Sequence, residues 1–398
     1  MSFVVRLVCS KCGTRYRPED NPVMCRKKDL GRLDVIYDYD AISKQLTRKT
    51  LQTRAPKDVW RYEELLPVRS RFAVRLGEGG TPLLHAKRLG AKLGMKKLFL
   101  KDETRNPTAS FKDRAMAVGI AKAVEMRKKD VVIASSGNAA ASLAAYSAAA
   151  GIRCHAFVPD DASVGKLAQL RLYGATTVQR KQEKEGEDAT VMAMLETVEK
   201  SGYYPCPSFG PFNPYQVEGP KTMAYEIFEQ MSWSSPDAIF IPTGSGCLAA
   251  GIWKGVNDFR QLGLIEELPK LVVVQPEGNQ ALVRAIRAHK RFGGIVPEAF
   301  PKSIASGLLD PFPWDGDAVL TGIRETKGAG VSASDAEIME AVKDLAAYEG
   351  VFSEPSGAAG LAGLRKMLKD GMVKKDERAV VLVTGSGLKD PNIIADSG

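Results

Sequence analysis

The sequence is poor in several features that mark common classes of protein. No apolar run approaches the ~20 residues that a helix needs to span a bilayer, and the N-terminus has no long apolar stretch. We therefore expect neither a membrane protein nor a secretory signal. Only six cysteines occur in 398 residues, which indicates a reducing compartment such as the cytoplasm, without a disulfide framework. The three histidines stand in no recognisable catalytic motif.

The excess of positive charge does not indicate a nucleic-acid-binding protein. The formal net charge is +9, and residues 1–60 carry thirteen lysines and arginines against seven aspartates and glutamates. A basic surface attracts polyanions, but this chain has no basic helical repeat and no aromatic pattern for stacking on bases. A small anionic substrate explains a mildly basic enzyme at least as well, so we expect no nucleic-acid or membrane partner.

The pattern along the chain predicts an α/β protein with open twisted sheets. The 398 residues are enough for two domains and an appendage, and with 44% hydrophobic residues the chain can bury substantial cores. From Leu98 onward, short apolar runs alternate with helical stretches, which is typical of parallel sheets covered by helices. The predicted strands include 131–134, 155–158, 238–241, 271–274 and 380–383.

Residues 110–114, Ser-Phe-Lys-Asp-Arg, offer a lysine amine where a carbonyl compound could be held covalently. They follow an Asn-Pro-Thr turn, and Thr108 or Ser110 can cap a helix that runs through 115–124. Lys112 then lies in the first helical turn, where the helix dipole disfavours a cation. A neutral amine is the form that condenses with an aldehyde. On this stretch alone, a solvated surface lysine is an equally good interpretation.

Three polar turns follow predicted strands and precede predicted helices or the end of the chain. The first, Ser135-Ser136-Gly137-Asn138, forms a cup of backbone N–H groups that suits a carboxylate. In the second, Thr243-Gly244-Ser245-Gly246-Cys247, small residues let the backbone close around a phosphate. The third begins at Thr384. Each loop alone is a weak signal, whereas the lysine and all three loops in one chain are much more specific.

In this order the segments resemble the threonine synthase branch of the pyridoxal-phosphate enzymes, whose fold is shared with tryptophan synthase β and the serine/threonine dehydratases. The resemblance extends from about Leu76 to Pro391. Besides the segments above, it includes Gly77-Glu-Gly-Gly-Thr-Pro-Leu83, Gly165-Lys-Leu-Ala-Gln169, Glu218-Gly-Pro-Lys-Thr222, Gln275-Pro-Glu-Gly278, Ser353-Glu-Pro-Ser-Gly-Ala-Ala359 and Thr384-Gly-Ser-Gly-Leu-Lys-Asp-Pro391.

The resemblance implies an architecture and an oligomeric state. It is that of fold type II among these enzymes, with a small domain at 106–205 inserted in a large one formed by 61–105 and 206–398. Residues 1–60 are then an N-terminal extension, and its stretch 34–60 is predicted to be an extended arm. A homodimer is expected by analogy with the family.

The resemblance also implies pyridoxal 5′-phosphate as cofactor and a role for each motif residue. Lys112 matches the Schiff-base lysine, which also moves protons once the substrate has displaced it. Gly244, Ser245, Gly246 and Cys247 match the phosphate loop. Asn138 matches the hydrogen-bond donor to the ring hydroxyl, and Thr384 matches the hydroxyl that faces the pyridine nitrogen. The turn of Ser135, Ser136, Gly137 and Asn138 is expected to bind the substrate carboxylate.

For threonine synthase the substrate is O-phosphohomoserine, which needs a second phosphate site, and here the sequence departs from the family. Relatives commonly carry threonine where Ala139 stands, arginine where Gln216 stands and asparagine where Ser245 stands. Charge-assisted bonds from an arginine fork are strong, so its loss is not a small change. Other cations could supply the missing charge, namely Arg105, Arg114, Lys166 and Lys221.

The reaction therefore has alternatives, although we expect a carbon–oxygen lyase that converts O-phosphohomoserine and water to threonine and phosphate. An ammonia-lyase acting on threonine or serine needs the same cofactor machinery without the second phosphate site. A β- or γ-replacement enzyme is a further possibility. A non-catalytic cofactor-binding protein is also conceivable, but the retention of Lys112, Asn138 and Thr384 argues against it.

The N-terminal extension contains Cys9, Cys12 and Cys25, arranged as in a zinc knuckle. Archaeal-type relatives usually present a second Cys-x-x-Cys pair, whereas this chain has Lys28 at the last position. Three thiolates can hold zinc with one further ligand, for which Asp29 is a candidate. From the sequence we favour a degenerate knuckle that has kept its fold and lost the metal.

Overall fold

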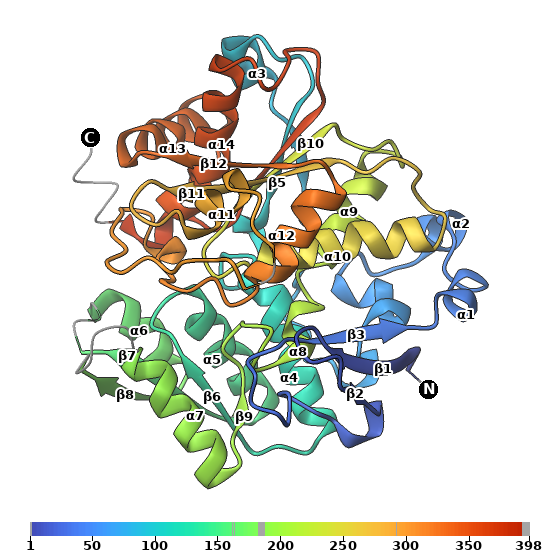
Figure 1. Cartoon of the computed structure of the whole chain (residues 1–398), viewed down its shortest axis with the longest axis vertical. Coiled ribbons are helices and arrows are strands. Elements are labelled where there is room, and N and C mark those ends of the chain that lie inside the picture. The colour runs from blue at the N-terminus through green and yellow to red at the C-terminus, as the bar shows by residue number, and fades with distance from the viewer. Residues whose placement is uncertain (1, 161, 163, 182–187, 292, 392–398) are drawn as a thin grey trace. The chain divides into compact units, whose positions relative to one another are not determined.

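The computed structural model of the chain describes residues 2–160, 162, 164–181, 188–291 and 293–391. Contacts divide it into two compact units (Figure 1). The first unit comprises residues 1–79 and 112–222, and the second comprises 80–111 and 223–398. The first unit thus includes the N-terminal extension, which the sequence analysis treated as separate. It also includes residues 206–222, which that analysis placed in the large domain. The domain boundaries drawn from the sequence stay a prediction.

The first unit contains two sheets. The three-stranded sheet has the order β2-β1-β3 and is antiparallel, with β1 in the centre. The four-stranded sheet has the order β8-β7-β6-β9 and is parallel throughout. The strands of this unit are β1 (Val4–Cys9), β2 (Arg15–Tyr16), β3 (Leu33–Tyr37), β6 (Asp130–Ala134), β7 (Arg153–Pro159), β8 (Thr176–Arg180) and β9 (Tyr204–Pro205).

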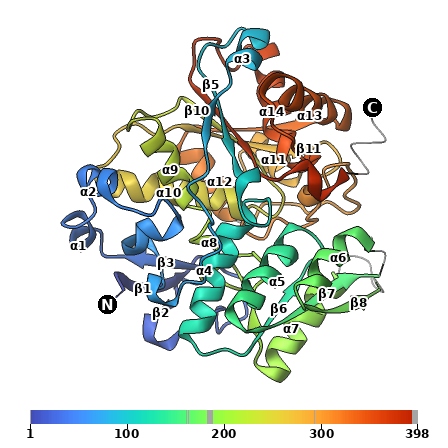
Figure 2. The ribbon, with the colours of Figure 1, turned by 180° about the vertical axis from the view of Figure 1, so that it is seen from behind.

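Alanine-rich helices cover the parallel sheet of the first unit. Its helices are α1 (Tyr39–Ser43), α2 (Arg48–Thr53), α4 (Lys112–Glu125), α5 (Asn138–Ala150), α6 (Val164–Leu172), α7 (Ala189–Ser201) and α8 (Pro214–Val217). Helices α4 and α5 lie side by side, as Figure 2 shows from behind. Most of their residues are buried, and alanine side chains allow the two helix axes to approach closely. This packing makes the first turn of α4 a rigid support for Lys112.

The second unit is built on one six-stranded sheet with the order β12-β11-β10-β13-β5-β4. All neighbours are parallel except the edge strand β4, which is antiparallel to β5. The strands are β4 (Leu83–His85), β5 (Leu98–Asp102), β10 (Ala238–Pro242), β11 (Lys270–Pro276), β12 (Ala329–Ala333) and β13 (Ala379–Val383). The α/β fold with parallel sheets that the alternating pattern predicted is therefore confirmed.

Helices pack on this sheet through small residues. In α14, Gly360 lies so close to the sheet that an added Cβ would be 3.2 Å from Val381 Cγ1, and one at Gly363 would be 2.6 Å from Val274 Cγ2. A larger side chain at either position would push the helix off the strands. The helices are α3 (Lys87–Leu93), α9 (Thr222–Gln230), α10 (Cys247–Gln261), α11 (Ala281–Arg287), α12 (Gly316–Glu325), α13 (Asp335–Glu349) and α14 (Pro355–Lys369).

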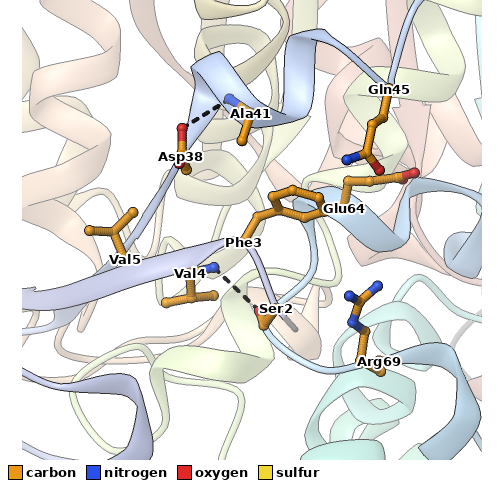
Figure 3. Close-up of a pocket in the computed structure, with 9 residues that line it drawn as sticks. All are labelled: Ser2, Phe3, Val4, Val5, Asp38, Ala41, Gln45, Glu64 and Arg69. Atoms are coloured by element: carbon orange, nitrogen blue, oxygen red, sulfur yellow. Dashed lines mark hydrogen bonds between the residues drawn. The ribbon is translucent and has the colours of Figure 1, made fainter.

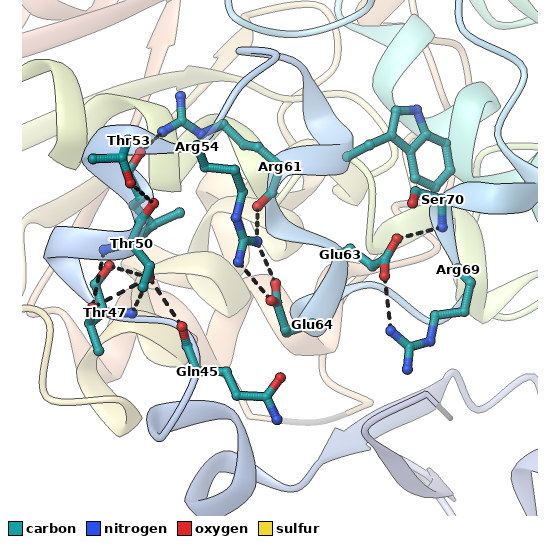
Figure 4. A network of polar contacts seen from close by, with 12 residues as sticks. Gln45, Thr47, Thr50, Thr53, Arg54, Arg61, Glu63, Glu64, Arg69 and Ser70 are labelled. Atoms are coloured by element: carbon teal, nitrogen blue, oxygen red, sulfur yellow. Dashed lines mark hydrogen bonds and ion pairs between the residues drawn. The ribbon is translucent and has the colours of Figure 1, made fainter.

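The prediction of an extended arm over residues 34–60 is wrong. This stretch contains β3, α1 and α2, and a polar network anchors it (Figure 4). The Arg54 guanidinium donates to both carboxylate oxygens of Glu64, at 2.7 and 2.8 Å. Burial alone would raise the pKa of Glu63, but hydrogen bonds from Ser70 and Arg69 outweigh it and hold that pKa below its usual value. Capped helices and paired charges thus replace the free arm.

Contacts also join the N-terminal sheet to the loop around residue 218 of the same unit. The Tyr37 hydroxyl donates to Glu218 Oε2 at 2.7 Å, and Lys221 Nζ lies 2.6 Å from the same carboxylate oxygen. Lys221 Nζ also sits 4.2 Å from the centre of the Tyr37 ring, which is a cation–π contact. All three side chains are buried, so each charge depends on its partners for the solvation that it has lost.

Candidate active site

Lys112 is the first residue of α4, as its place after an Asn-Pro-Thr turn predicted. Its side chain is partly buried, and its Nζ donates to the Ser208 hydroxyl at 3.1 Å. Backbone N–H groups in a first helical turn have no partner within the helix, so polar groups and anions are favoured near them. The amine is therefore held at the polar end of a buried helix.

Three contacts fix the first turn of α4. The Ser142 hydroxyl of α5 donates to Asp113 at 2.5 Å, and Arg114 Nη1 donates to Thr222 Oγ1 at 3.0 Å. Gly219 lies so close that an added Cβ would be 1.9 Å from the Arg114 carbonyl oxygen. Since the side chains of Asp113 and Arg114 are fully buried, the backbone that carries Lys112 has little freedom to move.

Ser208 contacts the lysine, although the sequence analysis did not single it out. It is buried and its backbone has a left-handed φ of 64°, which is uncommon for a residue other than glycine. Its N–H donates to Gln216 Oε1 at 3.0 Å, while Gln216 Nε2 lies 2.9 Å from Met116 Sδ. The amide of Gln216 is thus engaged inside the unit. No local sequence motif marks Ser208, because its position depends on a loop that turns back onto α4.

Substitution of Ser208 by alanine should slow the covalent attachment of a carbonyl cofactor at Lys112. The change removes the hydrogen bond from the Lys112 amine to the Ser208 hydroxyl, which is worth about 1.5 kcal/mol, or roughly a 10-fold slower incorporation. The rate would be followed as the growth of visible absorbance when cofactor is added to the cofactor-free protein. The Tm should change little, because alanine keeps the same backbone. An unaltered incorporation rate would contradict the role given to this hydroxyl.

The predicted carboxylate cup lies where β6 ends and α5 begins. Ser135 N donates to the Phe157 carbonyl at 3.0 Å, and Gly137 N donates to Ser135 Oγ at 3.2 Å. The four residues from Ser135 to Asn138 are all partly buried, and Ala139 behind them is buried. The carboxyl end of a parallel strand and the N-terminus of a helix meet here, which favours an anion.

The predicted phosphate loop belongs to the second unit, between β10 and α10. Gly246 caps α10 with a φ of 98°, a conformation that favours glycine. An added Cβ at Gly244 would lie 2.9 Å from Asp310 Oδ2 and 3.1 Å from Leu308 Cα. Both glycines are therefore required by the backbone path. A loop without protruding side chains at the N-terminus of a 15-residue helix fits a phosphate group.

Thr384 directly follows β13 and is also part of the second unit. Its carbonyl oxygen accepts a hydrogen bond of 2.9 Å from the N–H of Phe111, the residue that precedes Lys112 in the chain. The Ser386 N–H donates to the Ala109 carbonyl, also at 2.9 Å. The strand end that carries Thr384 is therefore paired with the segment that leads into the lysine. Of the predicted residues, Lys112 and 135–138 belong to the first unit, and 244–247 and Thr384 to the second.

A buried carboxylate ties the Gly-Glu-Gly-Gly stretch to the first unit. Glu78 accepts hydrogen bonds from Trp60 Nε1 at 2.6 Å, from the Tyr146 hydroxyl at 2.9 Å and from the Leu76 N–H at 2.9 Å. Burial and the neighbouring negative charge of Glu78 raise the pKa of Tyr146, which keeps this phenol protonated as a donor. This motif therefore has a structural role in the fold around α5.

Three of the four cations that could replace the missing arginine contact other groups. Arg114 and Lys221 are fully buried in the first unit and contact Thr222 and Glu218, as described above. Arg105, in the second unit, is largely exposed and bonds Asp102 at 3.0 Å. The side chain of Lys166 lies outside the described part of the structure.

A separate pocket of about 500 Å³ lies in the N-terminal region of the first unit (Figure 3). Its walls include Phe3, Asp38, Glu64 and Arg69. None of the predicted cofactor residues lines it, and its lining lacks a lysine or a glycine loop at a helix N-terminus. We therefore do not assign the chemistry to this pocket.

Comparison with known proteins identifies the family. A family profile described as pyridoxal-phosphate dependent enzyme matches residues 74–385. The threonine synthase of Methanocaldococcus jannaschii is 40% identical over 386 residues, which cover 96% of this chain and 93% of that protein. The chain belongs to the threonine synthase family of pyridoxal-phosphate-dependent enzymes. The threonine synthase of Mycobacterium tuberculosis is 37% identical over 83% of this chain and 88% of its own length.

Solved structures agree with this assignment at the level of the fold. Maize serine racemase superposes with a TM-score of 0.66 at 23% identity, over 80% of this chain and 91% of that one. The processed form of threonine deaminase isoform 2 from Solanum lycopersicum gives a TM-score of 0.65 at 23% identity, over 79% and 86%. The fold type II architecture, the enzyme class and pyridoxal 5′-phosphate as cofactor, all predicted from the sequence, are thus confirmed. No described helix has the length and hydrophobicity that crossing a membrane requires.

Proposed function

We propose that this enzyme converts O-phosphohomoserine and water to threonine and inorganic phosphate. The observation that carries the proposal is its similarity to threonine synthases from end to end, with 40% identity over 96% of this chain and 93% of the relative. A match of that extent includes the N-terminal region as well as the cofactor-binding fold. The second archaeal relative, from Methanosarcina acetivorans, is 40% identical over 98% of this chain.

The bound cofactor stabilises the negative charge left when a proton departs from the substrate Cα. We assign its covalent attachment to Lys112, whose amine lies at the start of a rigid helix beside the Ser208 hydroxyl. Once the substrate is bound, the freed amine can carry protons between the substrate Cα and Cβ. The fixed first turn of α4 supports this role, because proton transfer requires a donor and an acceptor at a constant separation.

The remaining residues orient the cofactor and the substrate. The backbone of Gly244, Ser245, Gly246 and Cys247 would hold the cofactor phosphate at the N-terminus of α10. Asn138 would donate to the ring hydroxyl, and the Thr384 hydroxyl would face the ring nitrogen. The Ser135-Ser136-Gly137-Asn138 turn would bind the substrate carboxylate at the N-terminus of α5. These assignments rest on the family motif, and the local geometry of each loop supports them.

A threonine or serine ammonia-lyase is the second candidate. It is favoured by the departures from the family pattern at Ala139, Gln216 and Ser245, together with the internal contacts of Gln216. Gln216 is neutral and its amide is bonded to Ser208, so it does not supply the positive charge of the phosphate-binding arginine. Such an enzyme would eliminate water from its substrate and needs no second phosphate site.

Incubation of the cofactor-loaded enzyme with O-phosphohomoserine should yield threonine and inorganic phosphate in equal amounts. With threonine or serine alone, formation of a 2-oxo acid and ammonia should be at least about tenfold slower. These substrates lack the phosphate group that the proposed enzyme recognises and releases. Both products would be measured in parallel on one preparation. Rapid 2-oxo acid formation without turnover of O-phosphohomoserine would support the ammonia-lyase and reject our proposal.

We also propose a homodimer that works in the cytoplasm on a small anionic amino acid. None of the six cysteines forms a disulfide in the structure, which suits a reducing compartment. The dimer is proposed by analogy with the family alone.

A further inference from the structure

Four potential metal ligands converge in the N-terminal sheet of the first unit. Cys9 ends β1 and Cys12 follows in the tight turn to β2, where the Gly13 N–H donates to the Cys9 carbonyl at 3.0 Å. Cys25 opens a second turn, closed by a hydrogen bond of 2.9 Å from the Lys28 N–H to the Cys25 carbonyl. Asp29 follows this turn, so that two turns present all four side chains to one point.

The separations of the ligand atoms match a tetrahedral zinc site. All four atoms lie within 4.8 Å of one another. Zinc–sulfur bonds of about 2.3 Å and zinc–oxygen bonds of about 2.0 Å place tetrahedral sulfurs about 3.8 Å apart, and sulfur and oxygen about 3.5 Å apart. The observed distances are 3.6 Å between the Cys12 and Cys25 sulfurs, and 3.4 and 3.5 Å from Cys9 Sγ to the Asp29 oxygens.

The surroundings are adapted to this cluster. An added Cβ at Gly31 would lie 2.4 Å from Cys9 Sγ and 3.0 Å from Asp29 Oδ1, so only glycine leaves room for these groups. The Gly31 N–H also donates to Asp29 Oδ1 at 2.9 Å. On the other side the Tyr16 hydroxyl donates to Cys25 Sγ at 3.2 Å and accepts from the Arg26 N–H. Such outer contacts orient the ligands of metal sites.

We propose that the three cysteine thiolates and the Asp29 carboxylate bind one Zn²⁺ ion. Sulfur-rich ligands favour zinc over magnesium or calcium. Four protein ligands leave no open position for substrate, so the ion is structural and holds the two turns of the β2-β1-β3 sheet together. The sequence favoured a metal-free knuckle because the fourth cysteine is absent. The structure leads to the opposite conclusion, because Asp29, adjacent to that position, supplies a carboxylate at the right distance.

Full-length protein produced in zinc-supplemented medium should retain about one zinc ion per chain after dialysis, as measured by mass spectrometry of the metal. Its cobalt-substituted form should show the absorption bands of tetrahedral cobalt with thiolate ligands. Replacement of Asp29 by alanine should weaken zinc binding at least about 10-fold, the cost found even for outer-shell groups. Asp29→Cys, which completes a four-cysteine set, should bind zinc at least as tightly as the wild type.

Two further variants keep the proposal open to refutation. Cys12→Ser should lose the thiolate bands of the cobalt form, whereas Cys154→Ala, a buried cysteine of β7, should retain them. The inference is overturned if the wild type retains no zinc, or if Cys12→Ser and Cys154→Ala behave alike. It is also overturned if the isolated protein contains a Cys12–Cys25 disulfide in place of the metal. All these readouts are independent of catalytic activity and therefore of the proposed reaction.

Discussion

Replacement of Lys112 by alanine should abolish the visible absorbance of the bound cofactor and reduce turnover at least about 1,000-fold. The amine is expected to serve both as the covalent anchor and as the carrier of protons, so its loss removes two functions at once. Alanine is a good helix former, and α4 should still begin at the same residue. The folded structure is therefore expected to persist, as circular dichroism would verify.

The control for this experiment is Lys129→Ala, which removes an exposed lysine just after α4. It should keep full absorbance and activity. Borohydride reduction of the wild type, followed by peptide mapping, should place the pyridoxyl label on the peptide that contains Lys112. A label on another lysine, or undiminished turnover by Lys112→Ala, would refute the assignment of the anchor.

Replacement of Gly219 by alanine should destabilise the enzyme by about 3 kcal/mol or more. The new methyl group would lie 1.9 Å from the Arg114 carbonyl oxygen and 2.5 Å from its carbonyl carbon. Both obstacles are backbone atoms, so no side-chain rotation can relieve the overlap. The first turn of α4 would have to move, and Lys112 with it. We therefore expect a lower Tm together with weaker retention of the cofactor.

Gly202→Ala provides a comparison in the same unit. Gly202 ends α7 with a left-handed φ of 67°, and an added Cβ there would have no neighbour within 4 Å. Only backbone strain of about 1–2 kcal/mol should result, and cofactor retention should be unaffected. Equal decreases in Tm and in cofactor retention in the two variants would contradict the role given to the close contact between Gly219 and Arg114.

The sequence was sufficient for the repetitive parts of the fold. The predicted runs at 380–383 and 131–134 each differ by one residue from the observed strands, β13 and β6. Buried parallel strands are continuous apolar runs, so hydrophobicity alone marks them. The position of Lys112 in a first helical turn was equally predictable, because the Asn-Pro-Thr turn before it acts locally. The predicted cap by Thr108 or Ser110 is not the residue that precedes α4, which is Phe111. The family and the cofactor followed from motifs of the same local kind.

What the sequence did not predict depends on contacts between distant segments. Ser208 reaches Lys112 only because residues 206–213 form a loop that is held by the Gln216 amide. The helices within 34–60 are short, and helices of one or two turns need tertiary contacts for stability, such as the Arg54–Glu64 pair. The sequence offered Asp29 as a candidate ligand, but only the folded turns show that its carboxylate lies beside the three cysteines.

The joint burial of Tyr37, Glu218 and Lys221 has a consequence for how this protein can be shortened. Glu218 precedes Gly219, which lies against the backbone of Arg114 in the first turn of α4. The Tyr37 hydroxyl donates to the Glu218 carboxylate, which Lys221 also contacts. A chain trimmed to the family-wide catalytic region would leave that carboxylate with one partner fewer in a dry environment. The N-terminal extension therefore cannot be removed as a whole without exposing this cost. A shortened chain made for engineering should keep the strand that contains Tyr37.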